Sequence, residues 1–167
     1  MRLIRLIIIV TFILFASNTK AQNIQKWKIE DVVNYFSKKT DSVYVVNFWG
    51  TFCIPCVHEI PCLQSISDKY KTQKVKLLLV SLDLPNYYPD KIASFAAKNN
   101  IYADIVWLDE SNADHFCPQI DKKWQGDMPA TIFVNPKTGY KAFFEEELTP
   151  EKFEAELQKA ITGTVTN

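Results

Sequence analysis

Apolar residues in the middle of the chain form short, nearly continuous runs that predict buried β-strands. The runs at 43–49 and 75–82 are typical of parallel strands that are covered on both faces. A shorter apolar run at 104–108 predicts a third strand. Two more runs, at 130–134 and 140–144, flank the turn sequence Pro-Lys-Thr-Gly and predict a hairpin.

Between these strands the apolar residues recur every three or four positions, which predicts helices. Helical spacing covers residues 29–38, 57–70 and 89–99. The helix at 89–99 and the strand at 104–108 form an inserted βα unit. Residues 111–123 are expected to form a loop and a short helix that Pro118 interrupts.

The closing helix has a clear start signal, because Thr149 is a good N-cap and Pro150 suits the first helical position. Strands alternate with helices, and a hairpin and a final helix follow. This order predicts an α/β fold in which helices flank a mixed central sheet.

The N-terminal 21 residues have the layout of a secretory signal peptide. Arg2 and Arg5 precede an apolar run at 6–16, and a polar stretch ends at Ala21. The run of 11 residues is short for a membrane span, which needs about 20, and an uncleaved anchor remains the alternative. We therefore expect a signal peptide at 1–21, one domain at 22–167 and export to the periplasm.

Cleavage would also change the charge of the chain. The full sequence has 19 basic and 19 acidic residues, and loss of three basic residues leaves 16 against 19, a net charge of −3. That balance argues against nucleic acid as a partner. Export would place the four cysteines where disulfides persist.

The sequence Cys53-Ile54-Pro55-Cys56 joins the strand at 43–49 to the following helix and is the main candidate for chemistry. A cysteine in the first turn of a helix faces unpaired backbone N–H groups and the positive end of the helix dipole, which stabilise a thiolate. Cys56 lies one turn further on the same face, where it can resolve a mixed disulfide on Cys53. The pattern predicts reversible two-electron exchange.

A CxxC pair can also be half of a zinc site, but such a site needs a second pair of ligands. Cys62 and Cys117 stand singly, and the two histidines, His58 and His115, form no such pair; for His115 the sequence indicates no partner. We therefore expect neither a metal nor an organic cofactor. Cys62 and Cys117 could form a structural disulfide or remain two buried thiols.

Taken together, the segment 47–56, the sequence Glu59-Ile60-Pro61, Met128-Pro129 and the final hairpin and helix resemble thioredoxin-fold proteins. More narrowly, they resemble exported thiol-disulfide oxidoreductases of the TlpA and ResA type. The resemblance covers nearly all of residues 22–167. It implies a thioredoxin-like fold with an inserted βα unit.

The resemblance implies roles for individual residues. Cys53 would be the attacking thiolate and Cys56 the resolving thiol. Pro129 matches the family's cis-proline, beside which substrate binds, and Met128 would touch both sulfur and substrate. Phe52 stands where these proteins usually have Trp and keeps an apolar platform.

Glu59 matches an acidic residue of the family and lies on the same helical face as Cys56. If Glu59 is buried, its pKa should rise and it could take the proton that Cys56 loses. The alternative is an exposed glutamate that the helix dipole favours. Asn47 stands where thioredoxins carry an acid.

These features predict a reductase of protein disulfides that works through a mixed disulfide. Its partners would be disulfide- or dithiol-containing proteins and a membrane redox protein that supplies electrons, and cytochrome c maturation is one process it could serve. The alternatives are a copper carrier, since thiolates suit Cu(I), and a thioredoxin-fold interaction module without turnover. A thiol peroxidase would need a Thr-x-x-Cys motif and an arginine, and residues 22–167 contain no arginine.

Overall fold

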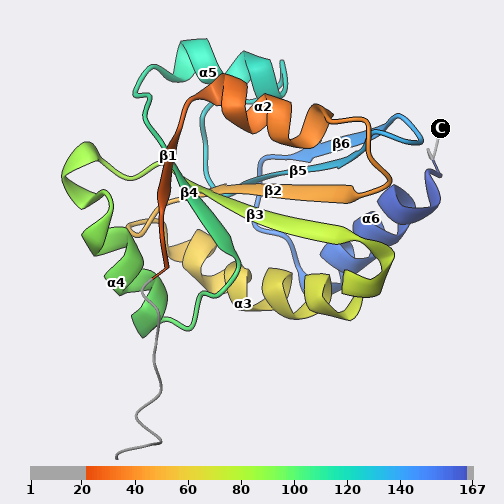
Figure 1. Cartoon of the computed structure of the whole chain (residues 1–167), viewed down its shortest axis with the longest axis horizontal. Helices are drawn as coiled ribbons and strands as arrows, with labels where there is room; N and C mark the ends of the chain where they lie inside the picture. The colour runs from red at the N-terminus through yellow and green to blue at the C-terminus, as the bar shows by residue number, and fades with distance from the viewer. Residues whose placement is uncertain (1–21, 165–167) are drawn as a thin grey trace, which may run out of the picture.

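The computed structural model describes residues 22–164, and a mixed six-stranded sheet forms its centre (Figure 1). The strands lie in the order β1-β4-β3-β2-β5-β6. The first four are parallel, whereas β5 runs antiparallel to both β2 and β6. The bounds are β1 Gln25–Trp27, β2 Val43–Trp49, β3 Val75–Ser81, β4 Asp104–Leu108, β5 Ala130–Asn135 and β6 Tyr140–Phe144.

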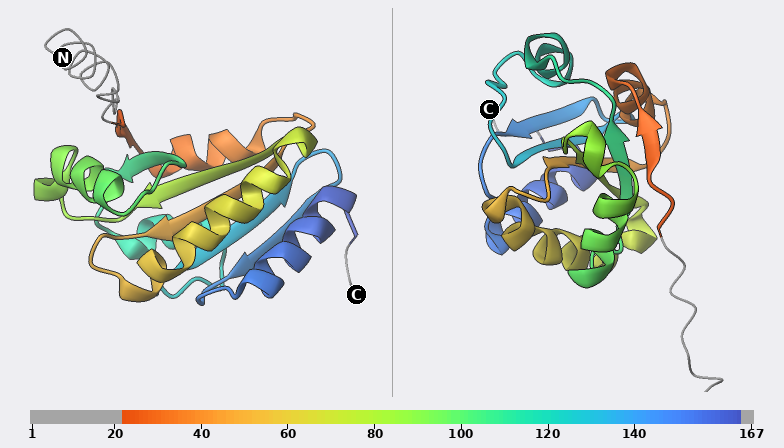
Figure 2. Two further views of the ribbon diagram at one scale, coloured as in Figure 1. Left: turned by 90° about the horizontal axis from the view of Figure 1, so that it is seen from below. Right: turned by 90° about the vertical axis from the view of Figure 1, so that its left-hand side faces the viewer.

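Helices cover both faces of this sheet (Figures 1 and 2). Helices α2 and α5 lie on one face, and α3, α4 and α6 lie on the other. Two short 3-10 turns, η1 and η2, follow α3 and β3. The bounds are α2 Ile29–Ser37, α3 Ile54–Lys69, η1 Lys71–Gln73, η2 Pro85–Tyr87, α4 Asp90–Lys98, α5 Ala113–Ile120 and α6 Pro150–Thr162.

Strand β2 shows why its sequence is continuously apolar. All seven of its residues are buried, because alternate side chains enter the cores on the two faces of the sheet. Val46 and Phe48 pack beneath α2 and α5, whereas Val45 and Trp49 pack on the side of α3. The predicted α/β fold with a mixed sheet flanked by helices is confirmed.

The five predicted strands and the predicted helices are present, with three differences. The helix after the CxxC motif begins at Ile54, three residues before the apolar spacing marks it, so Cys56 lies in its first turn as the CxxC spacing predicts. Strand β1 was not predicted, because three residues with little burial give no pattern. Pro118 does not interrupt α5: a proline removes one backbone bond, and the buried side chains of Phe116 and Ile120 hold the helix against the core.

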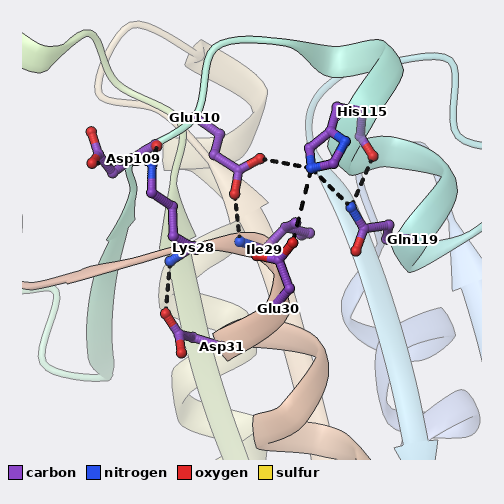
Figure 3. A network of polar contacts seen from close by, with 8 residues as sticks. All are labelled: Lys28, Ile29, Glu30, Asp31, Asp109, Glu110, His115 and Gln119. Atoms are coloured by element: carbon purple, nitrogen blue, oxygen red, sulfur yellow. Dashed lines mark hydrogen bonds and ion pairs between the residues drawn. The ribbon is translucent and has the colours of Figure 1, made fainter.

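A polar network fastens α5 to the start of α2 (Figure 3). One oxygen of Glu110 accepts a hydrogen bond of 2.8 Å from the Ile29 amide, and the other lies 3.6 Å from Nε2 of His115. The same nitrogen is 4.0 Å from Glu30 and 3.3 Å from Gln119. The expectation that His115 has no partner is therefore wrong. The network joins three segments at the edge of the sheet where the parallel strands end.

The predicted signal peptide at 1–21 lies outside the described residues. Between residues 22 and 164, no helix combines the length and the apolar character that crossing a membrane requires.

Candidate active site

Cys53 and Cys56 lie where β2 passes into α3, and their sulfurs are joined in a disulfide with the two Cα atoms 5.3 Å apart. Cys53 is the N-cap of α3, and its Sγ accepts a hydrogen bond of 3.3 Å from the amide of Cys56. Cys53 is 8% exposed, whereas Cys56 is completely buried. A reactant arriving from solvent can therefore reach Cys53 but not Cys56.

Apolar side chains surround this disulfide. Phe52 and Ile54, which flank Cys53, are 62% and 82% exposed. Met128 is partly buried and packs in the same cluster as the two cysteines. The peptide bond between Met128 and Pro129 is cis, as the family resemblance predicts, and the bond before Pro89 is also cis.

Glu59 is one turn beyond Cys56 and only 3% exposed, so its carboxylate lies inside the protein. One oxygen accepts a hydrogen bond of 2.8 Å from Nδ2 of Asn47, and the other accepts one of 2.8 Å from the amide of Leu148. Burial raises the pKa of Glu59 to about 7 because it penalises the charged form, although both hydrogen bonds oppose the rise. The negative charge of Glu147 adds to it. The alternative of an exposed glutamate is wrong.

Asn47 explains how a glutamate can be held in this core. It is completely buried in β2, and its Nδ2 group donates both to Glu59 and, at 3.0 Å, to Oγ1 of Thr131 in β5. An acid at this position, as in thioredoxins, could not donate to Glu59 when ionised and would place two like charges in contact. Asparagine at position 47 and a buried carboxylate at position 59 therefore suit each other.

A second buried carboxylate holds the turn before Cys53, and the sequence interpretation missed it. Both oxygens of Asp83 lie 3.1 Å from the amide of Thr51, and one accepts a bond of 2.6 Å from the Thr51 hydroxyl. Ser81 donates to the other oxygen at 2.8 Å. The available signal was an aspartate just beyond a buried parallel strand, where side chains gather at the edge that carries the dithiol.

Cys62 and Cys117 are free thiols on opposite faces of the sheet. Cys62 packs on the side of α3 and α6, whereas Cys117 lies in the core beneath α2 and α5. Burial raises the pKa of both thiols, that of Cys117 to about 11. The alternative that Cys62 and Cys117 form a structural disulfide is wrong, because the sheet separates the two thiols.

The described residues do not meet the requirements of a metal site. Within the part of the chain that the structure describes, no group of three or more His, Cys, Asp or Glu side chains is placed to hold a metal ion. His58 is exposed, and its Nδ1 lies 2.5 Å from Glu147.

Comparison with known proteins agrees with this geometry. The family model described as AhpC/TSA matches residues 15–139. The chain belongs to the AhpC/TSA family. Among curated proteins it is similar to the thiol-disulfide oxidoreductase ResA of Oceanobacillus iheyensis, with 28% identity over 120 residues, covering 68% of this chain and 54% of the relative. ResA of Geobacillus kaustophilus is 28% identical over 114 residues, covering 68% of this chain and 60% of the relative.

The chain thus spans little more than half the length of these curated relatives. Among solved structures it resembles a thioredoxin-related protein from Neisseria meningitidis serogroup B, with a TM-score of 0.60, 25% identity and coverage of 75% of this chain and 86% of that one. A thiol:disulfide interchange protein from a Bacteroides species gives a TM-score of 0.58 and 22% identity, with 77% of each chain covered. The thioredoxin-like fold and the resemblance to the ResA type are confirmed.

Proposed function

We propose that this AhpC/TSA family member is an exported thiol-disulfide oxidoreductase that reduces disulfides in other proteins. One observation carries the proposal: three reactive groups follow one another along the start of α3. They are the accessible sulfur of Cys53, the buried sulfur of Cys56 and the buried carboxyl group of Glu59. The name thiol-disulfide oxidoreductase borne by the ResA relatives supports the same activity.

In the first step, the thiolate of reduced Cys53 attacks one sulfur of a substrate disulfide. A bond forms between Cys53 and that sulfur, the substrate S–S bond breaks, and the other substrate sulfur leaves as a thiolate that takes a proton from water. The free N–H groups and the dipole at the start of α3 stabilise the attacking thiolate. Phe52, Met128 and Pro129 hold the substrate segment beside it.

In the second step, Cys56 loses its proton to Glu59 and attacks Cys53. The bond between Cys53 and the substrate breaks, the Cys53–Cys56 disulfide forms, and the second substrate sulfur leaves and is protonated. The substrate has then gained two electrons and two protons. Glu59 suits this role because an acid with a pKa of about 7 can both accept and release a proton near neutral pH.

The oxidised protein needs an electron donor to restore its dithiol. We propose that a membrane redox protein supplies the electrons, and that the substrates are exported proteins that carry disulfides. Removal of a signal peptide at 1–21 would deliver the domain to the periplasm, where reduced thiols are needed for processes such as cytochrome c maturation.

Insulin reduction tests the activity directly. With dithiothreitol as donor, the wild-type protein should accelerate the precipitation of the insulin B chain, and Cys53→Ser should reduce the rate to that of dithiothreitol alone. Cys62→Ser, a matched change in the same helix, should keep the wild-type rate. Equal rates for wild type and Cys53→Ser would contradict the proposal and favour an interaction module without turnover.

The direction of electron flow has its own test. Equilibration with glutathione gives the reduction potential of the Cys53–Cys56 pair, and a reductase should lie near thioredoxin at about −270 mV. A value close to that of DsbA, about −120 mV, would contradict the reductase assignment.

A further inference from the structure

A pocket of about 590 Å³ lies between α3 and the segment that leads into α6. The two helices pack side by side on the same face of the sheet (Figure 2). Residues of α3 and residues around the start of α6 line the pocket: His58, Glu59, Pro61, Cys62, Glu147, Leu148, Thr149 and Pro150. Glu59, the proton acceptor of the proposed mechanism, therefore borders a space that solvent can enter.

The carboxyl group of Glu59 bridges the core and the wall of this pocket. Its Oε1 accepts a hydrogen bond from Asn47 in β2, and its Oε2 accepts one from the amide of Leu148, which lines the pocket. The rest of the side chain is enclosed by protein. The pocket thus brings solvent next to the side of the acid that Leu148 holds.

The proposed mechanism needs a route for the proton of this acid. In the second step Glu59 takes the proton of Cys56 and becomes neutral, and before the next turnover its O–H bond must break and the proton must pass to water. Substrate covers the surface around Cys53 while the mixed disulfide exists. Within the described chain, Phe52, Cys53 and Met128 do not line the pocket. The pocket therefore offers Glu59 contact with solvent on a side that bound substrate leaves open.

Glu147 places a negative charge on the wall of this pocket. It is exposed, it directly precedes Leu148, and its Oε1 lies 2.5 Å from Nδ1 of His58. A negative charge near a carboxyl group favours the neutral form of that group, and this is the direction in which Glu147 acts on the pKa of Glu59. Because both carboxyl groups line one pocket, Glu147 helps Glu59 to hold a proton near neutral pH.

The other groups near Glu59 compete little with this charge. From the surrounding elements they are Cys56, His58 and Cys62 on α3, Asn47 and Thr131 in the sheet, and Glu147 and Glu151 beside α6. The two sheet residues are neutral, and burial raises the pKa of the Cys62 thiol, which keeps it neutral at pH 7. Glu151 is exposed to solvent. Glu147, offset in part by His58 when this histidine is protonated, is therefore the main charge at the pocket.

We propose that this pocket is the route by which Glu59 exchanges its proton with solvent, and that Glu147 is a positioning residue that keeps the proton on Glu59. The substrate surface and the proton route are then separate, so the acid can reach equilibrium with water while substrate is attached to Cys53. This inference rests on the proposed reductase function and adds the path of the proton in its second step.

Titration of the oxidised protein tests the inference without turnover, because the Cys53–Cys56 disulfide holds no titrating thiol. Carbon-13 NMR follows the Glu59 carboxyl group, whose resonance is identified by its loss in Glu59→Gln. Glu147→Gln should lower the midpoint of this titration, about pH 7 in the wild type, by about half a pH unit, and salt should reduce the difference. Glu146→Gln changes an exposed neighbour outside the pocket lining and should leave the midpoint unchanged.

Filling the pocket should have the opposite effect, because it removes water from the carboxyl group. Cys62→Phe should raise the midpoint by about one pH unit and slow proton exchange, so that the Glu59 resonance broadens during the titration. Cys62→Leu should give a smaller change in the same direction, which keeps the test open if the larger side chain prevents folding. Ser65→Phe, at an exposed position of α3 outside the pocket lining, should change neither property.

Equal midpoints for wild type, Glu147→Gln and Cys62→Leu would overturn the inference, as would equal shifts for Glu147→Gln and Glu146→Gln. The insulin assay on the wild-type protein separates this result from a failure of the proposed function. Insulin reduction with unchanged midpoints rejects the pocket alone. Shifted midpoints without insulin reduction reject the reductase function, and the proton route of Glu59 then stands without a known reaction.

Discussion

The four cysteines form two pairs, and the surroundings of the Cys53–Cys56 pair differ from those of the two free thiols. Cys53 and Cys56 start a helix at the edge of the sheet, in reach of backbone amides and, for Cys53, of solvent. Cys62 and Cys117 lie against the two opposite cores. The first pair forms a disulfide, and the second is kept apart by the sheet.

The difference shows that the reactivity of each thiol in this protein is set by its position in the fold and by the groups around it. The helix start supplies amides that favour a thiolate, and Glu59 supplies a proton acceptor one turn from Cys56. Neither Cys62 nor Cys117 lies at a helix start, and although Cys62 is one turn beyond Glu59, burial raises the pKa of both thiols. A free cysteine in a core behaves as a small apolar residue.

The largest contrast should appear in alkylation of the reduced protein by iodoacetamide at pH 7. Burial raises the pKa of Cys117 from 9.0 to about 11, which alone lowers its thiolate population roughly a hundredfold. Restricted access should extend the difference from Cys53 to roughly a thousandfold. Peptide mapping after timed quenching measures each site. If Cys117 were modified as fast as Cys53 in the absence of denaturant, the two thiols would not differ in reactivity and this explanation would be contradicted.

The pH dependence of stability tests Glu59, the buried carboxyl group one turn beyond Cys56. Its pKa is about 7 in the folded protein against 4.5 ordinarily, so the folded state binds the proton more tightly than the unfolded state does. The resulting stabilisation is complete below pH 4.5 and is lost as pH rises to about 7, a loss of about 3 kcal/mol. Urea unfolding at pH 4.5 and 8 should show this loss in the wild type and lack it in Glu59→Gln.

Glu151→Gln is the matched control for that experiment, because Glu151 is exposed in the first turn of α6. It should retain the pH dependence of the wild type. If Glu59→Gln retained it as well, the carboxyl group would ionise in the folded state as readily as in the unfolded one.

Glu59→Gln should also slow the release of substrate from Cys53 by about a hundredfold at pH 7.5, because Cys56 loses its proton acceptor. Wild-type release should accelerate as pH rises through about 7, and the variant should lack that rise. Single-turnover kinetics with a fluorescent disulfide measure the release. An unchanged rate and pH profile would assign Glu59 a purely structural role.

The sequence was sufficient for the features that depend on local pattern. The apolar run of β2 predicted a strand buried on both faces, and the CxxC spacing predicted a dithiol at a helix start. The cis bond at Pro129 came from the family resemblance. Helix α3 begins three residues before the predicted start, because the apolar spacing becomes visible only beyond the dithiol.

Features that depend on tertiary contacts could not be predicted in this way. The burial of Glu59 depends on Asn47, twelve positions earlier, and on Leu148, 89 positions later. The separation of Cys62 from Cys117 depends on which face of the sheet each helix covers. Strand β1 is too short to show a period of its own, and its pairing with β4 defines it.

Trapping of the mixed disulfide most directly tests whether Cys53 is the sulfur that receives substrate. In reduced Cys56→Ser protein the second step cannot occur, so a disulfide peptide should remain attached in one equivalent. Intact mass and peptide mapping should place this adduct on Cys53, with Cys62 and Cys117 unmodified. An adduct on Cys62 or Cys117, or no adduct while the peptide is still reduced at the wild-type rate, would contradict the dithiol mechanism.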